Sequence, residues 1–225
     1  MLDSLVALER DAFLWLNGFH TPFMDEFMWL FSGKIAWLPL AAVFIGALIY
    51  KNRSQWREIV LLMLAIALAA TLCDQFASSL CKPLFTRFRP THHPDVMNDV
   101  ITVFGYRGGR YGFISSHAAN AFGFVTLTSL IFRYRAYTLW MFVWASITAY
   151  SRIYLGVHFI TDIIPGILAG LLFGYLVYRL YIIVSRKFSQ PSSHQFLHSR
   201  LNYVLYALLA TVIVIAVISI TLSTT

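Results

Sequence analysis

LNYVLYALLATVIVIAVISITL, residues 201–222, carries no charged side chain over a length that can cross a membrane as one helix, because a hydrocarbon layer of about 30 Å needs about 20 helical residues. A second stretch, IVLLMLAIALAA at 59–70, is apolar at every position. Of the 225 residues in the chain, 59% are hydrophobic and 12% are charged, whereas a soluble domain carries about 25% charged residues. The sequence therefore predicts an all-α integral membrane protein.

Apolar and polar segments alternate in a way that predicts a bundle of six transmembrane helices. The connections are short except for two polar stretches at 81–115 and 185–200. Because no repeat or low-complexity tract divides the chain, a single membrane domain over 1–225 accounts for it. It comprises an interfacial segment at 1–23, a core at 24–184, and a polar loop with the sixth helix at 185–225. The expected helices lie near 24–50, 57–80, 116–133, 136–152, 158–184 and 201–222.

The first 18 residues are predicted to form an amphipathic helix that lies in the membrane interface. Their charged positions exclude the uninterrupted apolar stretch of a cleaved signal peptide, and a frayed chain end is the alternative. The charged side chains are Asp3, Glu9, Arg10 and Asp11, and the apolar ones between them include Leu2, Leu5, Leu8, Phe13 and Leu16.

Basic residues gather on one side of the predicted bundle, in the connections after its first, third and fifth helices. They form no continuous run, so the net charge of +7 does not indicate a nucleic-acid partner. The positive-inside rule places this side in the cytoplasm and both termini outside. Together with the small size and short loops, this predicts a multi-pass protein of a bacterial inner membrane whose site faces the periplasm or exterior. The residues are Lys51, Arg53, Arg57, Arg133, Arg135, Arg179, Arg186, Lys187 and Arg200.

Three polar clusters interrupt the apolar sequence. They are KPLFTRFRP at 82–90, Ser115-Ser116-His117 at the start of the third expected helix, and a segment from Ser151 to Asp162. The first two lie in one loop and the third lies two membrane crossings later. An even number of crossings returns the chain to the same side, so all three clusters are predicted to meet at one face of the membrane.

The residue types in these clusters suit the binding and transfer of a phosphate group. A phosphate monoester carries nearly two negative charges, and Lys82, Arg89 and Arg152 supply three cations, of which an arginine can bind two oxygens at once. Each residue taken alone has an ordinary structural explanation, such as a helix cap or a snorkelling side chain. Ser115 and Ser116 open a helix, where free N–H groups bind anions. His158 and Asp162 stand four residues apart on one helix face, which lets the carboxylate orient the imidazole, and His117 is left as a candidate proton donor.

At this point the sequence resembles the type 2 phosphatidic acid phosphatase superfamily, which includes lipid phosphate phosphatases and vanadium haloperoxidases. Its signature is Lys-x6-Arg-Pro, then Pro-Ser-Gly-His, then Ser-Arg-x5-His-x3-Asp. The first and third motifs are complete here, from Lys82 to Pro90 and from Ser151 to Asp162. In the middle motif, Ile114 and Ser116 replace the family's Pro and Gly. The resemblance covers about residues 24–184.

The resemblance implies a covalent mechanism that needs no metal and no cofactor. His158 attacks phosphorus and becomes a phosphohistidine, Asp162 orients it, and His117 protonates the leaving group and then activates water. The backbone N–H that the family takes from its glycine is still present at position 116. The phosphoryl oxygens would be held by Lys82, Arg89, Ser115, Ser116 and Arg152.

Other polar residues allow further hypotheses. Arg87, Arg107 and Arg110 either draw an anionic headgroup to the site or only solubilise the loop. His92, His93 and Asp95 suggest a metal site, although a solvated loop explains them better. Lys34 and Asp74 lie at similar depth inside apolar segments, where charged residues are costly and usually paired, and this predicts a buried ion pair beneath the site.

The substrate is predicted to be an anionic lipid in the membrane, with undecaprenyl pyrophosphate preferred. Lipid A comes next, followed by phosphatidylglycerol phosphate and phosphatidic acid. The rival classes are a membrane transporter, a metal enzyme that uses His117, His158 and Asp162, and a silent scaffold. A transporter would spread its charges through the bundle, whereas here they gather at one membrane face.

Overall fold

A computed structural model describes residues 2–50, 56–188 and 198–224 of the chain. Lys51, Arg53 and most of the predicted loop at 185–200 lie outside the described residues. The α-helices are α1 (Leu2–Asn17), α2 (Pro22–Ser32), α3 (Leu38–Ile49), α4 (Trp56–Asp74), α5 (Lys82–Phe85), α6 (Ser116–Phe132), α7 (Arg135–Tyr154), α8 (Ile160–Phe188) and α9 (His198–Ser223). A π-helix at Gln75–Cys81 joins α4 to α5, and short 3₁₀ turns lie at Ile35–Trp37, Pro90–His92 and Val103–Gly105.

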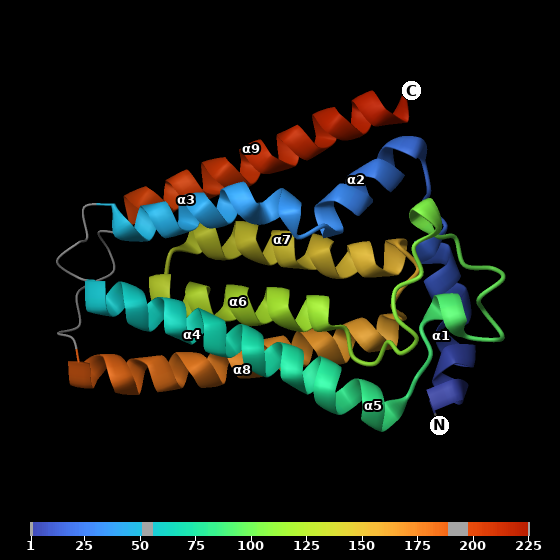
Figure 1. The fold of residues 1–225 in the computed structure, drawn as a ribbon, viewed down its shortest axis with the longest axis horizontal. Coiled ribbons are helices and arrows are strands. Elements are labelled where there is room, and N and C mark those ends of the chain that lie inside the picture. Colours follow the sequence, from blue (N-terminus) through green and yellow to red (C-terminus); the bar gives the residue numbers. More distant parts are fainter. Residues whose placement is uncertain (1, 51–55, 189–197, 225) are drawn as a thin grey trace.

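The long helices run side by side along the long axis of the molecule, with α6 in the middle of the bundle (Figure 1). At one end α1 lies across this direction, and the loop at 86–115 covers the same end (Figure 1). Both described ends of the chain also lie there. The described part of the chain forms no β-strand beyond one isolated bridge between Phe88 and Tyr111, so the predicted all-α class is confirmed.

Three helices are long and apolar enough to cross a membrane, and the bent pair of α2 and α3 makes a fourth if it counts as one span. The three are Trp56–Phe85, Ile160–Lys187 and Arg200–Ser223. The predicted number of six is therefore not confirmed by length and hydropathy. α6 and α7 lie within the bundle (Figure 1). Many side chains of α6 are buried by other parts of the protein, so its small and polar residues need not contact lipid.

The first predicted span, at 24–50, is wrong as a single straight helix. The chain bends by 70° between α2 and the next helical segment, which begins at Ile35. The break lies at Gly33, which closes α2 in an extended conformation with ψ 135°. The indole N–H of Trp37 donates to the carbonyl of Phe31 at 2.8 Å and so ties the two sides of the break together.

Glycines on α8 bring its backbone against α6, with which it packs closely. A Cβ atom added to Gly170 would lie 2.5 Å from the carbonyl oxygen of Ala119, and one added to Gly174 would lie 2.6 Å from that of Gly123. Small residues spaced four apart commonly allow such close approach between membrane helices. This contact brings the start of α6 next to the start of α8.

The N-terminal residues form α1, whose position at a membrane interface stays a prediction. Val6 and Phe13 are buried on the core side, whereas Leu8 and Trp15 are exposed. At its last residue, the amide of Asn17 donates to the carbonyls of Ile101, Ile153 and Tyr154 and accepts from the N–H of Ile101. These bonds fix α1 to the loop at 86–115 and to the end of α7.

Candidate active site

The three polar clusters converge at the end of the bundle that the loop at 86–115 covers. A guanidinium nitrogen of Arg89 lies 3.2 Å from Nε2 of His158, so the first cluster meets the third. The N–H of Ser115 donates to the carbonyl of Asp162 at 3.0 Å, so the second also meets the third. His117 and Arg152 line the same cavity. The expectation that the three clusters meet is therefore confirmed by their contacts.

His158 is held between a carboxylate and a cation. Its Nδ1 lies 3.4 Å from Oδ2 of Asp162, and only 1% of the side chain is exposed. An arginine donates hydrogen bonds and cannot accept them, so Nε2 must act as the acceptor opposite Arg89. The proton of a neutral ring then sits on Nδ1 and faces Asp162. This tautomer leaves the Nε2 lone pair available to attack an electrophile.

The electrostatic surroundings keep this imidazole neutral. Burial, followed by the positive charges of Arg89 and Arg152, holds the pKa of His158 well below its ordinary value of 6.5. Lys82 and Arg87 act on the ring in the same direction. A neutral ring is the nucleophilic form, so the site favours nucleophilic chemistry at neutral pH.

The three predicted phosphate-binding cations have no carboxylate partner within the described residues. Arg89 donates to the carbonyls of Tyr111 and Val157 at 3.2 and 3.1 Å. Arg152 donates to the hydroxyl of Ser32, and Lys82 donates to that of Ser78 at 3.1 Å. Since cations without counter-ions are costly to enclose, their gathering around one imidazole fits a site that receives an anion.

The middle cluster opens α6 despite its departures from the family's motif. Ser115 is the N-cap residue, and its hydroxyl accepts from the N–H of Ala118 at 3.4 Å. Ser116 is the first residue of the helix, and Ile114 is buried. The helix therefore starts at the predicted place, with its N-terminal end directed at the region of the three cations.

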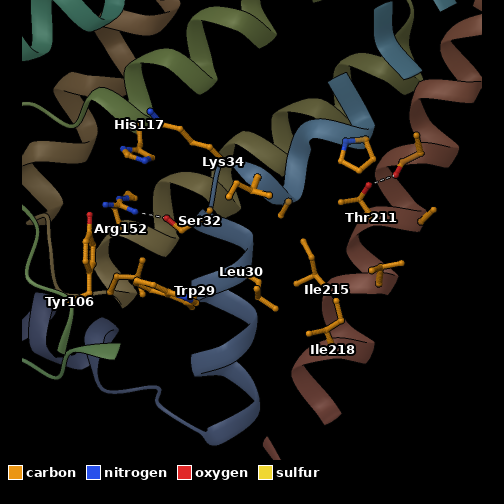
Figure 2. A pocket seen from close by; sticks show the side chains of 18 of the residues that line it. Trp29, Leu30, Ser32, Lys34, Tyr106, His117, Arg152, Thr211, Ile215 and Ile218 are labelled. Carbon is orange, nitrogen blue, oxygen red and sulfur yellow. Dashed lines mark hydrogen bonds between the residues drawn. The ribbon is translucent and has the colours of Figure 1, made fainter. Parts of the chain in front are cut away.

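A cavity of about 960 Å³ extends from His117 and Arg152 to apolar side chains of the bundle. Figure 2 shows His117, Lys34 and Arg152 on one side of it and side chains of α9 on the other. The α9 side is formed by apolar and small residues that include Ile215 and Ile218. The cavity thus offers a cationic end next to an apolar wall, which suits a lipid with an anionic headgroup.

The predicted ion pair between Lys34 and Asp74 is not formed among the described residues. The carboxylate of Asp74 accepts from the hydroxyl of Ser78 at 3.4 Å. Lys34 instead lies in the break after α2 and lines the cavity together with His117 and Arg152. The bend between Ser32 and Ile35, which the sequence did not reveal, turns this lysine toward the cavity.

The loop residues fall into two groups. Arg107 and Arg110 are exposed, so both of their predicted roles stay open. Arg87 is different, because only 4% of it is exposed and its guanidinium pairs with Glu9 and Asp162. Both readings of Arg87, as attracting a headgroup and as solubilising the loop, are therefore wrong.

Several polar side chains of the loop at 91–95 form hydrogen bonds with neighbouring residues of the loop. His92 bonds to the hydroxyl of Thr91, and Nδ1 of His93 accepts from the N–H of Asp95 at 3.3 Å. Among the residues that the structure describes, no group of three or more His, Cys, Asp or Glu side chains is arranged to hold a metal ion.

Sequence reasoning missed several residues that complete the site. Ser32 and Tyr106 contact Arg152, whose guanidinium carbon lies 5.9 Å from the ring centre of Tyr106. Glu9 reaches the start of α8 from the distant N-terminal helix. The sequence held one signal for this contact, because Glu9 is a carboxylate in a helix that was predicted to bury one face.

The chain is similar to known proteins over most of its length. The model of the family described as the PAP2 superfamily matches residues 58–186. A protein of Porphyromonas gingivalis named lipid A 4'-phosphatase is 44% identical over 181 residues, covering 80% of this chain and 76% of that protein. One of Bacteroides thetaiotaomicron with the same name is 36% identical over 179 residues, covering 79% of each.

Two solved structures share the fold. The crystal structure of Aquifex aeolicus LpxE is 27% identical with a TM-score of 0.54, covering 76% of this chain and 95% of that one. A transmembrane PAP2-type phosphatidylglycerolphosphate phosphatase from Bacillus subtilis is 21% identical with a TM-score of 0.57, covering 81% and 89%. The second likeness supports the fold alone.

Proposed function

Because this chain belongs to the PAP2 superfamily and is a membrane lipid phosphatase of that type, we propose that it hydrolyses a phosphate monoester of lipid A through a phosphohistidine. The observation that carries the mechanism is the placement of His158, with Nδ1 facing Asp162 and Nε2 facing Arg89. This placement presents a neutral, oriented nucleophile next to three cations.

In the first step, Nε2 of His158 attacks phosphorus while the bond from phosphorus to the ester oxygen breaks. His117 gives its proton to that oxygen, which leaves as the lipid alcohol. The attacking ring becomes positively charged, and the carboxylate of Asp162 stabilises it through Nδ1–H. In the second step, His117 takes a proton from water, whose oxygen attacks phosphorus. The bond between phosphorus and nitrogen breaks, and inorganic phosphate leaves.

The remaining residues stabilise the charge of the phosphoryl group. Lys82, Arg89 and Arg152 are proposed to bind its oxygens, together with the hydroxyl of Ser115 and the N–H of Ser116. Phosphoryl transfer depends mainly on such positioning and charge stabilisation. Arg89 would exchange its bond to Nε2 for a bond to a phosphoryl oxygen when the substrate arrives.

The lipid A assignment rests on the two relatives that carry that name. Undecaprenyl pyrophosphate, preferred from the sequence, has less support because neither relative is named for it. The apolar α9 wall supports a lipid substrate, since acyl chains could lie against Ile215 and Ile218 while the phosphate occupies the cationic end. The basic residues Arg133, Arg135 and Arg186 lie where α6 meets α7 and in the last turn of α8, at the end of the bundle away from the site. The positive-inside rule assigns that end to the cytoplasm, so we place the site in the outer leaflet of a bacterial inner membrane.

Phosphate release from a panel of lipids in detergent tests this proposal. The panel contains lipid A, undecaprenyl pyrophosphate, phosphatidylglycerol phosphate and phosphatidic acid. Wild-type protein should release phosphate fastest from lipid A and should retain activity in EDTA. His158→Ala should lose it, while His92→Ala, in the outer loop, should keep it. Full activity of His158→Ala would overturn the mechanism, and preference for another lipid would overturn the substrate.

A further inference from the structure

A buried network of charged side chains extends from the proposed nucleophile to the N-terminal helix. Arg87 donates from one guanidinium nitrogen to Oδ1 of Asp162 at 2.7 Å and from the other to Oε1 of Glu9 at 2.5 Å. Its side chain is 2% exposed, and the carboxylates on either side are 0% and 8% exposed. Arg87 also lies over the ring of Phe159, 4.8 Å from its centre. Enclosed in this way, Arg87 is unavailable to a substrate.

Glu9 forms hydrogen bonds to the start of α8 as well as to Arg87. Its Oε2 accepts from the N–H of Thr161 at 2.9 Å, and its Oε1 accepts from the Thr161 hydroxyl at 2.5 Å. That hydroxyl in turn accepts from Arg87 at 2.7 Å. A carboxylate from a helix about 150 residues away thus caps the helix that carries Asp162, and it satisfies an N–H that would otherwise lack a partner.

The division of bonds on Asp162 shows what the network does. Arg87 occupies Oδ1, which leaves Oδ2 to the N–H of Phe159 at 3.0 Å and to Nδ1 of His158. The plane of the carboxylate is therefore fixed on one side by Arg87 and on the other by the backbone. Because the ring of His158 is oriented by this carboxylate, its orientation is restrained as well.

Charge balance gives Glu9 a role of its own. An arginine paired with Asp162 alone would neutralise that carboxylate and weaken its attraction for an imidazolium. With Glu9 present, the two carboxylates and one guanidinium carry a net charge of −1. This charge faces Nδ1 of His158, on the ring that becomes positive when Nε2 bonds to phosphorus. The network therefore favours the charged intermediate over the neutral resting ring.

From this geometry we propose that Glu9 and Arg87 are positioning residues, which orient Asp162 and preserve its negative charge for His158. The inference rests on the proposed function of His158 and adds α1 to the machinery of the reaction. It predicts an effect on the chemical step and none on the binding of the lipid phosphate, since both side chains are buried and their polar groups are occupied by one another, Asp162 and Thr161.

The test compares kcat and KM of purified variants on lipid A. Glu9→Gln keeps the size of the side chain and removes its charge, so we expect kcat to fall by about 10–100-fold, as for other partners of oriented ligands and bases, with KM unchanged. Asp11→Asn is the matched control, because it removes the same charge from the same helix at a side chain that is 97% exposed. Arg87→Lys keeps the positive charge but offers one donor nitrogen in place of the two that hold Asp162 and Glu9, so its kcat should also fall.

A second measurement separates positioning from loss of structure. If Glu9 acts through Asp162, Glu9→Gln should lower kcat no further in an Asp162→Asn background, because residues that act as a unit are not additive. The inference fails if Glu9→Gln keeps wild-type kcat or if the two losses simply multiply. In each of these cases an inactive His158→Ala shows that the proposed function itself still holds.

Discussion

The guanidinium of Arg89 donates to Nε2 of His158 across 3.2 Å. This bond assigns the tautomer, because the donor can only be met by an unprotonated nitrogen. It also places a cation where the phosphoryl group must arrive. A residue proposed to bind phosphate therefore covers the proposed nucleophile, and substrate binding has to separate the two.

Replacing Asp162 with Asn should lower kcat by about 10²–10⁴-fold, the scale of loss when the orienting carboxylate of a catalytic histidine becomes an amide. The amide can present its NH₂ group to Nδ1 and so stabilise the wrong tautomer. KM should change little, because both carboxylate oxygens of Asp162 are occupied by Arg87, the backbone and His158. Asp95→Asn, in the outer loop and with a side chain that is 83% exposed, is the control. A kcat within twofold of wild type for Asp162→Asn would contradict the role.

Lowering the pH below 6.5 should not reduce the activity through protonation of His158. Its pKa is held well below 6.5 by burial and by Arg89 and Arg152, so the ring stays neutral where an ordinary histidine would be half protonated. Single-turnover rates between about pH 5 and pH 8, compared for substrates with different phosphate pKa values, separate this group from the substrate's own ionisation near pH 6. A loss of rate caused by protonation of the enzyme near pH 6.5 would contradict a lowered pKa of His158.

The same lowered pKa makes folding stability depend on pH. The unfolded chain binds a proton on His158 below about pH 6.5, whereas the folded chain excludes it. The contribution of His158 to the free energy of unfolding is therefore fully present above that pH and is lost as the pH falls. Unfolding in detergent should show a smaller acid destabilisation for His158→Ala than for wild type. An equal slope in both proteins would argue against an uncharged buried ring.

Lys34→Met should raise KM for lipid A by roughly 10–100-fold, the equivalent of a charge-assisted hydrogen bond of about 1.5–3 kcal/mol. The lysine lines the cavity next to His117 and Arg152 and has no carboxylate partner in the described parts of the chain. Lys187→Met, in the last turn of α8, removes a cation away from the cavity and should leave KM unchanged. Equal KM values for both variants would remove Lys34 from the binding site.

Gly170→Ala should destabilise the protein by about 1–3 kcal/mol, as overpacking of a tight interface generally does. The added Cβ would lie 2.5 Å from the carbonyl oxygen of Ala119, so α6 and α8 must separate. Gly46→Ala is the control, because a Cβ there meets nothing within 4 Å. Thermal unfolding in detergent compares the two, and equal midpoints would show that this helix contact is not limiting.

The sequence by itself determined the class of the fold and predicted that three polar clusters would meet. Long apolar stretches predict helices in lipid, because the backbone must satisfy its hydrogen bonds internally there. Parity along the chain predicted that the clusters with Lys82, Ser115 and His158 would share one face, and their contacts confirm it. These inferences succeeded because they depend on composition and spacing, which are local properties of the chain.

Tertiary structure decided what depends on partners distant in the sequence. It turned Lys34 away from Asp74 and toward the cavity, because a 70° bend follows α2. It also buried Arg87 between Glu9 and Asp162, where an exposed loop arginine was expected. No spacing rule connects Glu9 with Asp162, since only the packing of α1 across the end of the bundle brings the two carboxylates to one guanidinium.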